Sequence, residues 1–478
     1  MTRTFADEPT PLWSRIIRLF LGLVVVLSVL VVGEQPAVAA RVPTTLAEQK
    51  PVQSGPVVPE FPVDYLGVVW GTTGASPGFA GGTEPHGAVR FLKDGVWGPW
   101  IPLVPDGADA PGQWGSALVP GGDAEAYQIR GIPPTAVAAR AVAINTTDGP
   151  QVTVGERPRL SALSNCLSRA DWGADESLRD AYPWPETFEP VRVMTVHHTV
   201  TANDDPDPAA TVRAIYRYHA IDREWGDIAY QSLIDEAGRV YEGRWSGSES
   251  ASCVSAGGDG TDFAHDAAGD LVTGGHTADY TPGNLGLALL GDLTTVHPKE
   301  AARVALEDAL AEFATRHELD PLGMVDYYNA VWDTSATIET ISAHRDWPSP
   351  AGDTACPGDA FYPRVPDVRA NVADLMGLSV PAVSVAEVAY STSGGRGDKD
   401  LSIGISLYPA VPGAEVDAEV TRDGAVILAD TLTTDGTGVA SIFIRNHESG
   451  CYATSVTGIH GTGRVFDGVT PDNEYGCD

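Results

Sequence analysis

The sequence predicts a multidomain protein: a central α/β domain, with a mixed β-sheet and flanking helices, between two all-β sandwich domains. Three observations lead to this prediction. The chain has 478 residues, which is too long for one ordinary hydrophobic core. Short apolar runs separated by glycine, proline and Asp-Gly turns occupy both flanks. Strand patterns alternate with helix patterns only in the middle, as in layered α/β folds.

Residues 1–40 are typical of a secretory signal peptide or an N-terminal anchor. Arginines precede an uncharged apolar stretch, Leu19 to Val32, and the small-residue site Ala37-Val38-Ala39 follows it. The stretch is shorter than the ~20 residues that span a bilayer. Extended back across Arg18, however, it could stay uncleaved as an anchor. We therefore expect a secreted, extracellular protein, associated with the cell wall or anchored at its N-terminus. It contacts a membrane only if this segment is uncleaved.

Both flanks of the chain carry strand signals. Residues 41–60, rich in proline and valine, are expected to form a linker. A β-rich domain is expected over 61–160, where short apolar runs are separated by turn residues. An immunoglobulin-like β-sandwich is expected over 381–478, where alternating apolar residues precede an Asp-Gly turn at 423–424.

The central segment, 161–380, mixes strands and helices. Arg192 to His198 is a run rich in β-branched residues and predicts a buried strand. Asp207 to His219 places apolar residues at spacings of three and four, which predicts one face of a helix. Pro298 to His317 is the strongest helix pattern in the chain. We also expect a hairpin over 227–242, a strand over 284–290 and a closing helix over 366–375.

The charge of the chain excludes one class of partner. Acidic residues outnumber basic ones by 64 to 30, and the formal net charge is −34. Such a surface repels a phosphate backbone, so we expect no nucleic-acid partner. We expect the protein to be a monomer.

The five cysteines are an odd number, which needs an explanation in an exported protein. If Cys356 is a metal thiolate, four cysteines remain and can form two disulfides. Their positions favour pairing within each segment, Cys166 with Cys253 and Cys451 with Cys477. Four cysteines allow three connectivities, and the sequence leaves the choice among them open.

Candidate metal ligands are spread along the central segment. His197 lies at the end of the predicted strand, His344 opens a His-Arg-Asp triplet, and Cys356 lies in Thr-Ala-Cys-Pro-Gly. A catalytic zinc takes about three such ligands and leaves one position open. Successive side chains of a strand face opposite sides, so His198 is assigned a structural or supporting role. His219 is expected to be a core residue.

The sequence around these residues resembles the zinc-dependent N-acetylmuramoyl-L-alanine amidases of the peptidoglycan-recognition and phage-lysozyme type, the type 2 amidases. Matching blocks follow one another in the family's order across the central segment. They are Ser168 to Ala174, Val196-His197-His198-Thr199, Trp225 to Tyr230, Val240 to Arg244, Gly275-His276-Thr277, Asn284 to Ala288, His344-Arg345-Asp346 and Thr354 to Gly358.

This resemblance implies a fold, a cofactor and a reaction. The central domain is expected to have the type 2 amidase-like fold, with zinc (Zn²⁺) bound by His197, His344 and Cys356. The implied reaction is the hydrolysis, by zinc-activated water, of the amide between N-acetylmuramic acid and the L-alanine of the stem peptide. Peptidoglycan is the implied partner.

The resemblance also implies roles for four further residues. Tyr230 is expected to be catalytic, next to the water or the developing oxyanion. Thr354 is also expected to be catalytic, because it occupies the position where phage relatives carry a lysine. His276 and Asn284 are candidates for substrate contacts, with structural hydrogen bonding at strand ends as the alternative.

Some features depart from the family pattern or leave alternatives open. The loop between His344 and Cys356 is longer than usual in the family, and an insertion at 246–270 could be a lid or a disulfide-tethered loop. The strand residues 286–291 contain no carboxylate, which favours the tyrosine-using branch of these amidases. The alternative function is a non-catalytic peptidoglycan-binding receptor or surface protein on the same fold. The complete ligand set favours the enzyme.

Overall fold

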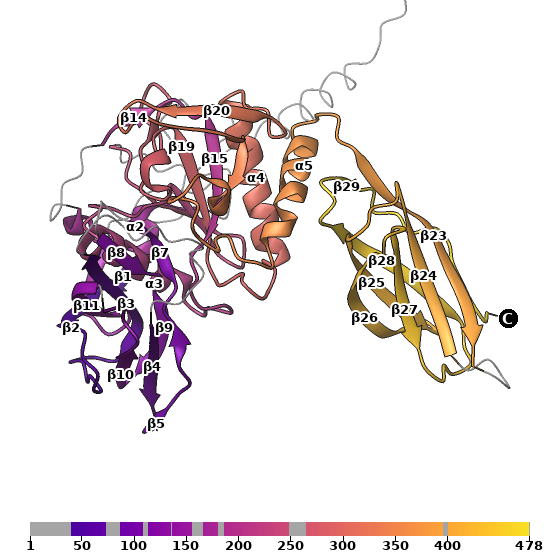
Figure 1. Ribbon diagram of the computed structural model, residues 1–478, viewed down its shortest axis with the longest axis horizontal. Coiled ribbons are helices and arrows are strands. Elements are labelled where there is room, and N and C mark those ends of the chain that lie inside the picture. The colour runs from indigo at the N-terminus through magenta and orange to yellow at the C-terminus, as the bar shows by residue number, and fades with distance from the viewer. Residues whose placement is uncertain are drawn as a thin grey trace, which may run out of the picture.

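The computed structural model describes residues 40–72, 87–108, 113–134, 136–154, 166–179, 186–247, 264–394 and 400–477. Within these ranges the chain forms an N-terminal β domain, a central α/β domain and a C-terminal β domain that stands to one side of the other two (Figure 1). The predicted signal, apart from Ala40, lies outside the described residues. Of the helices that the structure describes, none is long and apolar enough to cross a membrane.

A mixed β-sheet is the scaffold of the central domain. Its strand order is β13-β17-β16-β19-β15-β22, in which β16, β19, β15 and β22 are parallel and β17 is antiparallel to β16. The strands of this domain are β13 (Cys166–Leu167), β14 (Phe188–Glu189), β15 (Val193–His198), β16 (Ser232–Ile234), β17 (Val240–Glu242), β18 (Leu271–Val272), β19 (Asn284–Leu289), β20 (Met324–Asn329), β21 (Thr334–Glu339) and β22 (Ile341–Ala343). Its helices and helical turns are α2 (Arg169–Trp172), η1 (Glu176–Leu178), α3 (Pro208–Arg217), η2 (Tyr218–Asp222), η3 (Ala278–Tyr280), α4 (Glu300–Arg316), η4 (His344–Asp346), η5 (Tyr362–Arg364) and α5 (Val365–Leu375).

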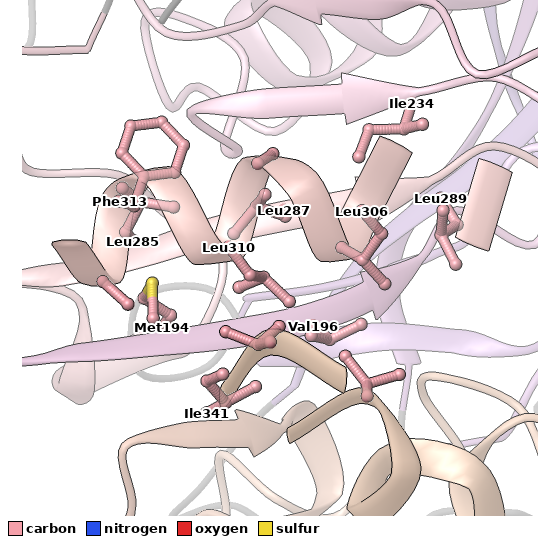
Figure 2. Close-up of a cluster of buried hydrophobic side chains, with 14 of the residues drawn as sticks. Met194, Val196, Ile234, Leu285, Leu287, Leu289, Leu306, Leu310, Phe313 and Ile341 are labelled. Carbon is pink, nitrogen blue, oxygen red and sulfur yellow. The ribbon is translucent and has the colours of Figure 1, made fainter. Parts of the chain in front are cut away.

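Alternating strand residues give this sheet two buried faces. Met194 and Val196 of β15 pack with Leu285 and Leu287 of β19 in one hydrophobic core, beneath α4 and α5. Figure 2 shows these side chains together with Leu306, Leu310 and Phe313 of α4. Because side chains alternate along a strand, His197 points to the opposite face from Val196. The mixed sheet with flanking helices and the predicted strands at 192–198 and 284–290 are therefore confirmed.

The N-terminal domain has two packed sheets and a two-stranded sheet of β1 and β12. One has the order β2-β11-β3-β8-β7, with β9 beside β3, and the other has the order β10-β4-β5, with β6 beside β4. Leu66 and Val68 of β3 meet Val89 and Phe91 of β4 in the core between them. The strands are β1 (Ala40–Pro43), β2 (Leu46–Pro51), β3 (Val63–Thr72), β4 (Ala88–Lys93), β5 (Val96–Trp97), β6 (Ile101–Pro102), β7 (Pro105–Ala108), β8 (Gln113–Ser116), β9 (Val119–Ala124), β10 (Ala126–Arg130), β11 (Ala136–Asn145) and β12 (Gln151–Val154).

The prediction of a linker over 41–60 is wrong. Residues 46–51 form β2, which pairs antiparallel with β11 along its whole length, and β1 pairs with β12. The local composition, rich in proline and valine, did not reveal this pairing because the partner strands β11 and β12 follow about ninety or more residues later in the chain.

The N-terminal domain shares a hydrophobic core with the central domain. Tyr65, Val69 and Val142, on the face of the sheet that points away from its own core, pack with Val212 and Ile215 of α3. Separating the two domains would expose these apolar side chains to water, which is unfavourable. The shared core therefore favours a fixed arrangement of the two domains. The boundary predicted near residue 160 therefore divides the chain into two consecutive domains. In space, these two domains pack together as one unit.

The C-terminal domain is a β-sandwich with a core of its own. Its sheets have the orders β27-β24-β23-β29 and β26-β25-β28, and Ile403 and Ile405 of one meet Val416 and Val420 of the other. The immunoglobulin-like topology remains a prediction. The strands are β23 (Ala382–Ser393), β24 (Asp400–Tyr408), β25 (Glu415–Arg422), β26 (Ala425–Thr433), β27 (Val439–Ile444), β28 (Tyr452–His460) and β29 (Val465–Phe466).

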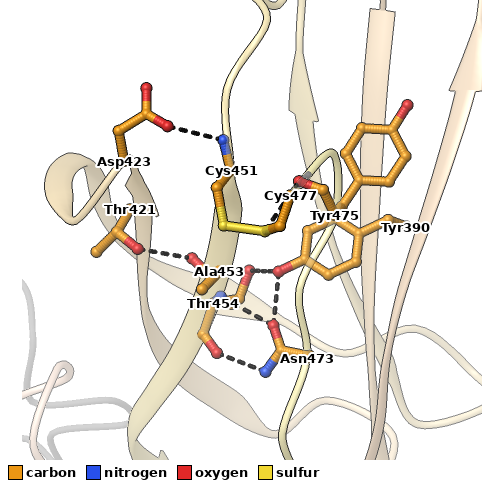
Figure 3. The surroundings of a disulfide bond; sticks show 9 residues. All are labelled: Tyr390, Thr421, Asp423, Cys451, Ala453, Thr454, Asn473, Tyr475 and Cys477. Carbon is orange, nitrogen blue, oxygen red and sulfur yellow. Dashed lines mark hydrogen bonds between the residues drawn. A yellow bond between two sulfur atoms is a disulfide. The ribbon is translucent and has the colours of Figure 1, made fainter.

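A disulfide ties the C-terminal segment to β28. Cys451 and Cys477 are bonded, as the sequence predicts. Figure 3 shows that Asn473 supports the same junction: it accepts from Tyr390 Oη at 2.6 Å and from the Thr454 amide at 2.9 Å. Cys166 is also disulfide-bonded, but its expected partner Cys253 lies outside the described residues.

The C-terminal domain contacts the central domain through a few polar groups near α5. The carboxylate of Asp367 accepts hydrogen bonds from the backbone amides of Gly461, Thr462 and Gly463, at 2.5, 2.9 and 2.8 Å. Arg364 forms an ion pair with Glu415 at 2.7 Å. These contacts are polar, whereas the core shared with the N-terminal domain is apolar.

Candidate metal centre

Two parallel strands bring His197 and His344 to the same edge of the central sheet. β15 and β22 run side by side, with Val196 opposite Ala343. His197 is the last residue but one of β15, and His344 directly follows β22, so the two imidazoles lie next to each other at the carboxyl ends of the strands. Their ring centroids are 4.6 Å apart.

The loop that follows His344 adds Cys356 to the two histidines. Arg345 holds the loop, because its backbone amide and its Nε both donate to the Cys356 carbonyl at 3.2 Å. The sulfur of Cys356 lies 3.7 Å from Nδ1 of His197. It also accepts a hydrogen bond from the backbone amide of His198 at 3.3 Å, which favours a thiolate at this position.

The three side chains fit a zinc ion. One ligand atom from each of His197, His344 and Cys356 lies within 4.8 Å of the others. Tetrahedral zinc with bonds of about 2.0–2.3 Å places neighbouring donors about 3.5 Å apart, close to the separation of Cys356 Sγ and His197 Nδ1. All three residues are buried. Cys356 carries a thiol, whereas Cys166, Cys451 and Cys477 are disulfide-bonded.

The protonation state of His197 suits a metal ligand. Burial, with added effects of His344 and His276, holds the pKa of His197 well below its ordinary value. The imidazole is therefore neutral near pH 7, and a neutral imidazole has the lone pair that a metal needs.

Tyr230 lies beside the three candidate ligands. Its ring centroid is 5.2 Å from that of His197, and the side chain is buried. Its backbone is fixed on both sides: Arg244 donates its amide to the Tyr230 carbonyl at 2.8 Å, and the neighbouring Ala229 amide donates to Nδ1 of His219 at 3.2 Å. The position is compatible with the catalytic role that the sequence predicts.

Thr354 acts on the loop that presents Cys356. Its hydroxyl accepts a hydrogen bond from the Cys356 amide at 3.1 Å. This contact orients the cysteine. A direct catalytic role of Thr354 stays a prediction.

Asn284 has structural hydrogen bonds, and its predicted substrate role stays a prediction. Its side chain is completely buried and accepts from Thr195 Oγ1 at 2.9 Å. It donates to Thr277 Oγ1 and to the Tyr280 carbonyl, both at 3.0 Å. These bonds use both polar atoms, so Asn284 braces the sheet, which is the alternative that the sequence left open.

His276 also has contacts inside the protein, and its predicted role in substrate binding stays a prediction. Its ring is buried, and both nitrogens have partners inside the protein: His197 Nε2 and the Asn284 carbonyl, each at 3.0 Å. Burial lowers the pKa of His276 to about 3. Sequence reasoning missed the contact with His197, because the two residues are 79 positions apart.

The two histidines expected to be structural have structural contacts. His198 faces away from the three ligands, and its Nδ1 accepts from the Leu293 amide at 3.0 Å. His219 accepts from Ala229 and lies against Trp225, with ring centroids 4.8 Å apart. The selection of His197 over His198 agrees with this geometry. Part of the insertion at 246–270, residues 248–263, lies outside the described residues.

Comparisons with known proteins identify relatives of the central domain. Residues 187–359 match the family model described as N-acetylmuramoyl-L-alanine amidase. The chain is 25% identical to Drosophila melanogaster peptidoglycan-recognition protein LB over 222 residues, which are 44% of this chain and 82% of that protein. It is 30% identical to human N-acetylmuramoyl-L-alanine amidase over 179 residues, which are 36% of this chain but only 23% of the human protein.

Among solved structures, wild-type Drosophila PGRP-LB matches with 22% identity and a TM-score of 0.29, covering 45% of this chain and 95% of that one. The family assignment rests on the sequence matches. The central domain belongs to the family of peptidoglycan-recognition proteins and type 2 N-acetylmuramoyl-L-alanine amidases.

Proposed function

We propose that this protein is a zinc-dependent N-acetylmuramoyl-L-alanine amidase. Its substrate is peptidoglycan, in which it hydrolyses the amide between the lactyl group of N-acetylmuramic acid and the L-alanine of the stem peptide. The observation that carries the proposal is the complete donor set of His197, His344 and Cys356, gathered within 4.8 Å beside Tyr230. Relatives of this family are named both as amidases and as recognition proteins, so family membership alone does not select hydrolysis.

The donor set has the composition of a catalytic rather than a structural site. Two neutral imidazoles and one thiolate leave a fourth tetrahedral position open, whereas structural zinc sites use four protein ligands. A zinc ion bound here would supply a Lewis acid that activates water and polarises the scissile carbonyl. The amide of His198 stabilises the charge of Cys356, and Thr354 orients the same residue.

Tyr230 is the proposed hydrogen-bond donor to the reacting carbonyl oxygen. Its buried ring next to His197 places a phenol where little water competes for it. A fixed donor in a site of low dielectric constant stabilises the negative charge that develops on the oxygen during attack. The amide nitrogen leaves as an amine, and the proton that it needs is the one that the attacking water releases.

The experiment combines metal analysis with product analysis. Purified full-length protein is assayed for zinc by mass spectrometry and for the release of stem peptides with a free N-terminal L-alanine from cell walls. The Cys356→Ser variant is compared in both assays. We expect stoichiometric zinc and release by the parent, and loss of both in the variant.

Two results would contradict the proposal. Release by the Cys356→Ser variant at the parent's rate would remove the cysteine from the reaction. Stoichiometric zinc in the parent without cleavage of any wall type would instead favour a peptidoglycan receptor. We also propose that the protein is secreted through residues 1–40 and that it is a monomer. Detection of the protein in a culture supernatant tests secretion, and light scattering tests the monomeric state.

A further inference from the structure

A continuous pair of hydrogen bonds links His197 to the backbone of β19. Nε2 of His197 lies 3.0 Å from Nδ1 of His276, and Nε2 of His276 lies 3.0 Å from the carbonyl oxygen of Asn284. The two rings meet edge to face, with an interplanar angle of 85°. The mechanism proposed above does not use His276.

The carbonyl group sets the direction of both bonds. A carbonyl oxygen can only accept, so Nε2 of His276 carries the hydrogen. In the neutral ring, Nδ1 of His276 is then an acceptor, and Nε2 of His197 donates to it. His197 is left with its lone pair on Nδ1, the atom that lies 3.7 Å from the sulfur of Cys356.

The packing around His276 keeps its ring in this orientation. A Cβ atom at Gly286 of β19 would come within 2.6 Å of Cδ2 of His276, and one at Gly274 would come within 2.9 Å of the same atom. No side chain can therefore replace either hydrogen while the ring stays in place. The two glycines leave room for the imidazole ring to lie directly against the backbone.

The acceptor at the end of the pair is also fixed. Asn284 is the first residue of β19, where it pairs with Val193 of β15. The three side-chain hydrogen bonds of Asn284 tie it to Thr195, Thr277 and Tyr280. The Asn284 carbonyl is thus held in place by these contacts, next to the strand that carries His197.

From these contacts we propose that His276 is a positioning residue that selects the tautomer and the ring orientation of His197. The inference rests on the proposed zinc-dependent function. Partners that hold the second nitrogen of a metal-binding histidine typically change metal affinity 10–100-fold when they are removed.

Two matched variants separate this role from packing. The amide oxygen of asparagine takes the place of Nδ1, so His276→Asn keeps the acceptor for His197. The amide of glutamine reaches the place of Nε2, so His276→Gln keeps the bond to the Asn284 carbonyl and loses that acceptor. We expect zinc affinity, measured by competition with a chromophoric chelator, to fall 10–100-fold in His276→Gln and to stay within about threefold in His276→Asn.

The spectrum of the cobalt-substituted protein gives a second readout. We expect the visible absorption bands of His276→Asn to match the parent and those of His276→Gln to shift, because the His197 ring is turned. Equal affinities and spectra for the two variants would overturn the inference. A parent that binds no zinc would instead refute the proposed function on which the inference rests.

A measurement without substitution covers the case in which a variant does not fold. Histidine-selective ¹⁵N labelling and long-range ¹H–¹⁵N correlation of the metal-free protein report which nitrogen of each ring carries the hydrogen. We expect the Nε2–H tautomer for both His197 and His276. An Nδ1–H tautomer at His197 would overturn the inference.

Discussion

Tyr218 of the central domain lies directly against Gly67 of the N-terminal sheet. A Cβ atom at position 67 would come within 2.4 Å of Cε2 of the tyrosine ring, and the tyrosine hydroxyl donates to the Ser116 carbonyl at 2.9 Å. Tyr218 also lines one small pocket with Tyr230 and with Leu118 of the N-terminal domain. The N-terminal domain is therefore a neighbour of the proposed catalytic tyrosine as well as a flank of the chain.

The substitution Gly67→Ala tests the fit of this interface. The added methyl group must displace a buried ring, and overpacking of this kind typically costs about 1–3 kcal/mol. We expect a loss of that size in the free energy of unfolding, measured by chemical denaturation. Gly404→Ala is the control, because a Cβ atom in that strand would meet its nearest neighbour at an ordinary 3.7 Å. Equal stability of both variants would show that Tyr218 can move.

Truncation tests the shared core. Removal of residues 40–160 would expose Val212 and Ile215 of α3, which pack against Tyr65 and Val69 in the intact protein. We expect a 161–380 fragment to be insoluble or unfolded and a 40–380 fragment to fold and hydrolyse cell walls. Circular dichroism and the product assay measure both. A folded, active 161–380 fragment would show that the N-terminal domain is dispensable.

The substitution Tyr230→Phe removes one hydroxyl group from the proposed active site. Loss of a donor to a developing oxyanion typically lowers the rate by roughly 10²–10³. We expect a fall of this size in kcat with unchanged zinc content. Tyr216→Phe deletes a buried tyrosine hydroxyl that donates to the Asp175 carbonyl instead, and should keep its activity. Similar rates for Tyr230→Phe and the parent would refute the donor role.

The neighbours His197 and His198 should differ in metal binding. His197→Ala removes a proposed ligand and should abolish stoichiometric zinc. His198→Asn keeps an acceptor for the Leu293 amide and leaves the backbone contact to Cys356 unchanged, so its zinc content should match the parent. Metal analysis of the two purified variants measures their zinc content. Loss of zinc in His198→Asn but not in His197→Ala would make His198 the ligand instead.

Glu242 should make stability depend on pH. Burial raises its pKa from 4.5 to about 7, and Glu176 and Asp227 add to the rise. Between these values the unfolded chain is ionised and the folded protein holds the proton, so stability falls as pH increases from about 4.5 to 7 and is constant above.

The substitution Glu242→Gln should remove this part of the slope in thermal unfolding. Glu125→Gln makes the same substitution at an exposed position and is the control. If the pH dependence of stability is unchanged in both variants, it arises from groups other than Glu242.

Much of the fold could be predicted where the signal is local. The β-branched run at 192–198 and the spacing of apolar residues over 298–317 predict the elements that the structure describes as β15 and α4. The ligand set could be predicted because its three residues lie within recognisable blocks. The linker at 41–60 was wrong because the strand at 46–51 is defined by its pairing with a distant partner.

The sequence by itself determined the candidate chemistry: two histidines and a cysteine carry donor atoms that zinc accepts, and strand alternation separates His197 from His198. The tertiary structure alone decided what surrounds them. It placed His276 between His197 and the Asn284 carbonyl, and seated its ring on Gly286. It also packed Gly67 against Tyr218. Such contacts join residues far apart in the chain, and no local pattern encodes them because they depend on how the packed sheets meet.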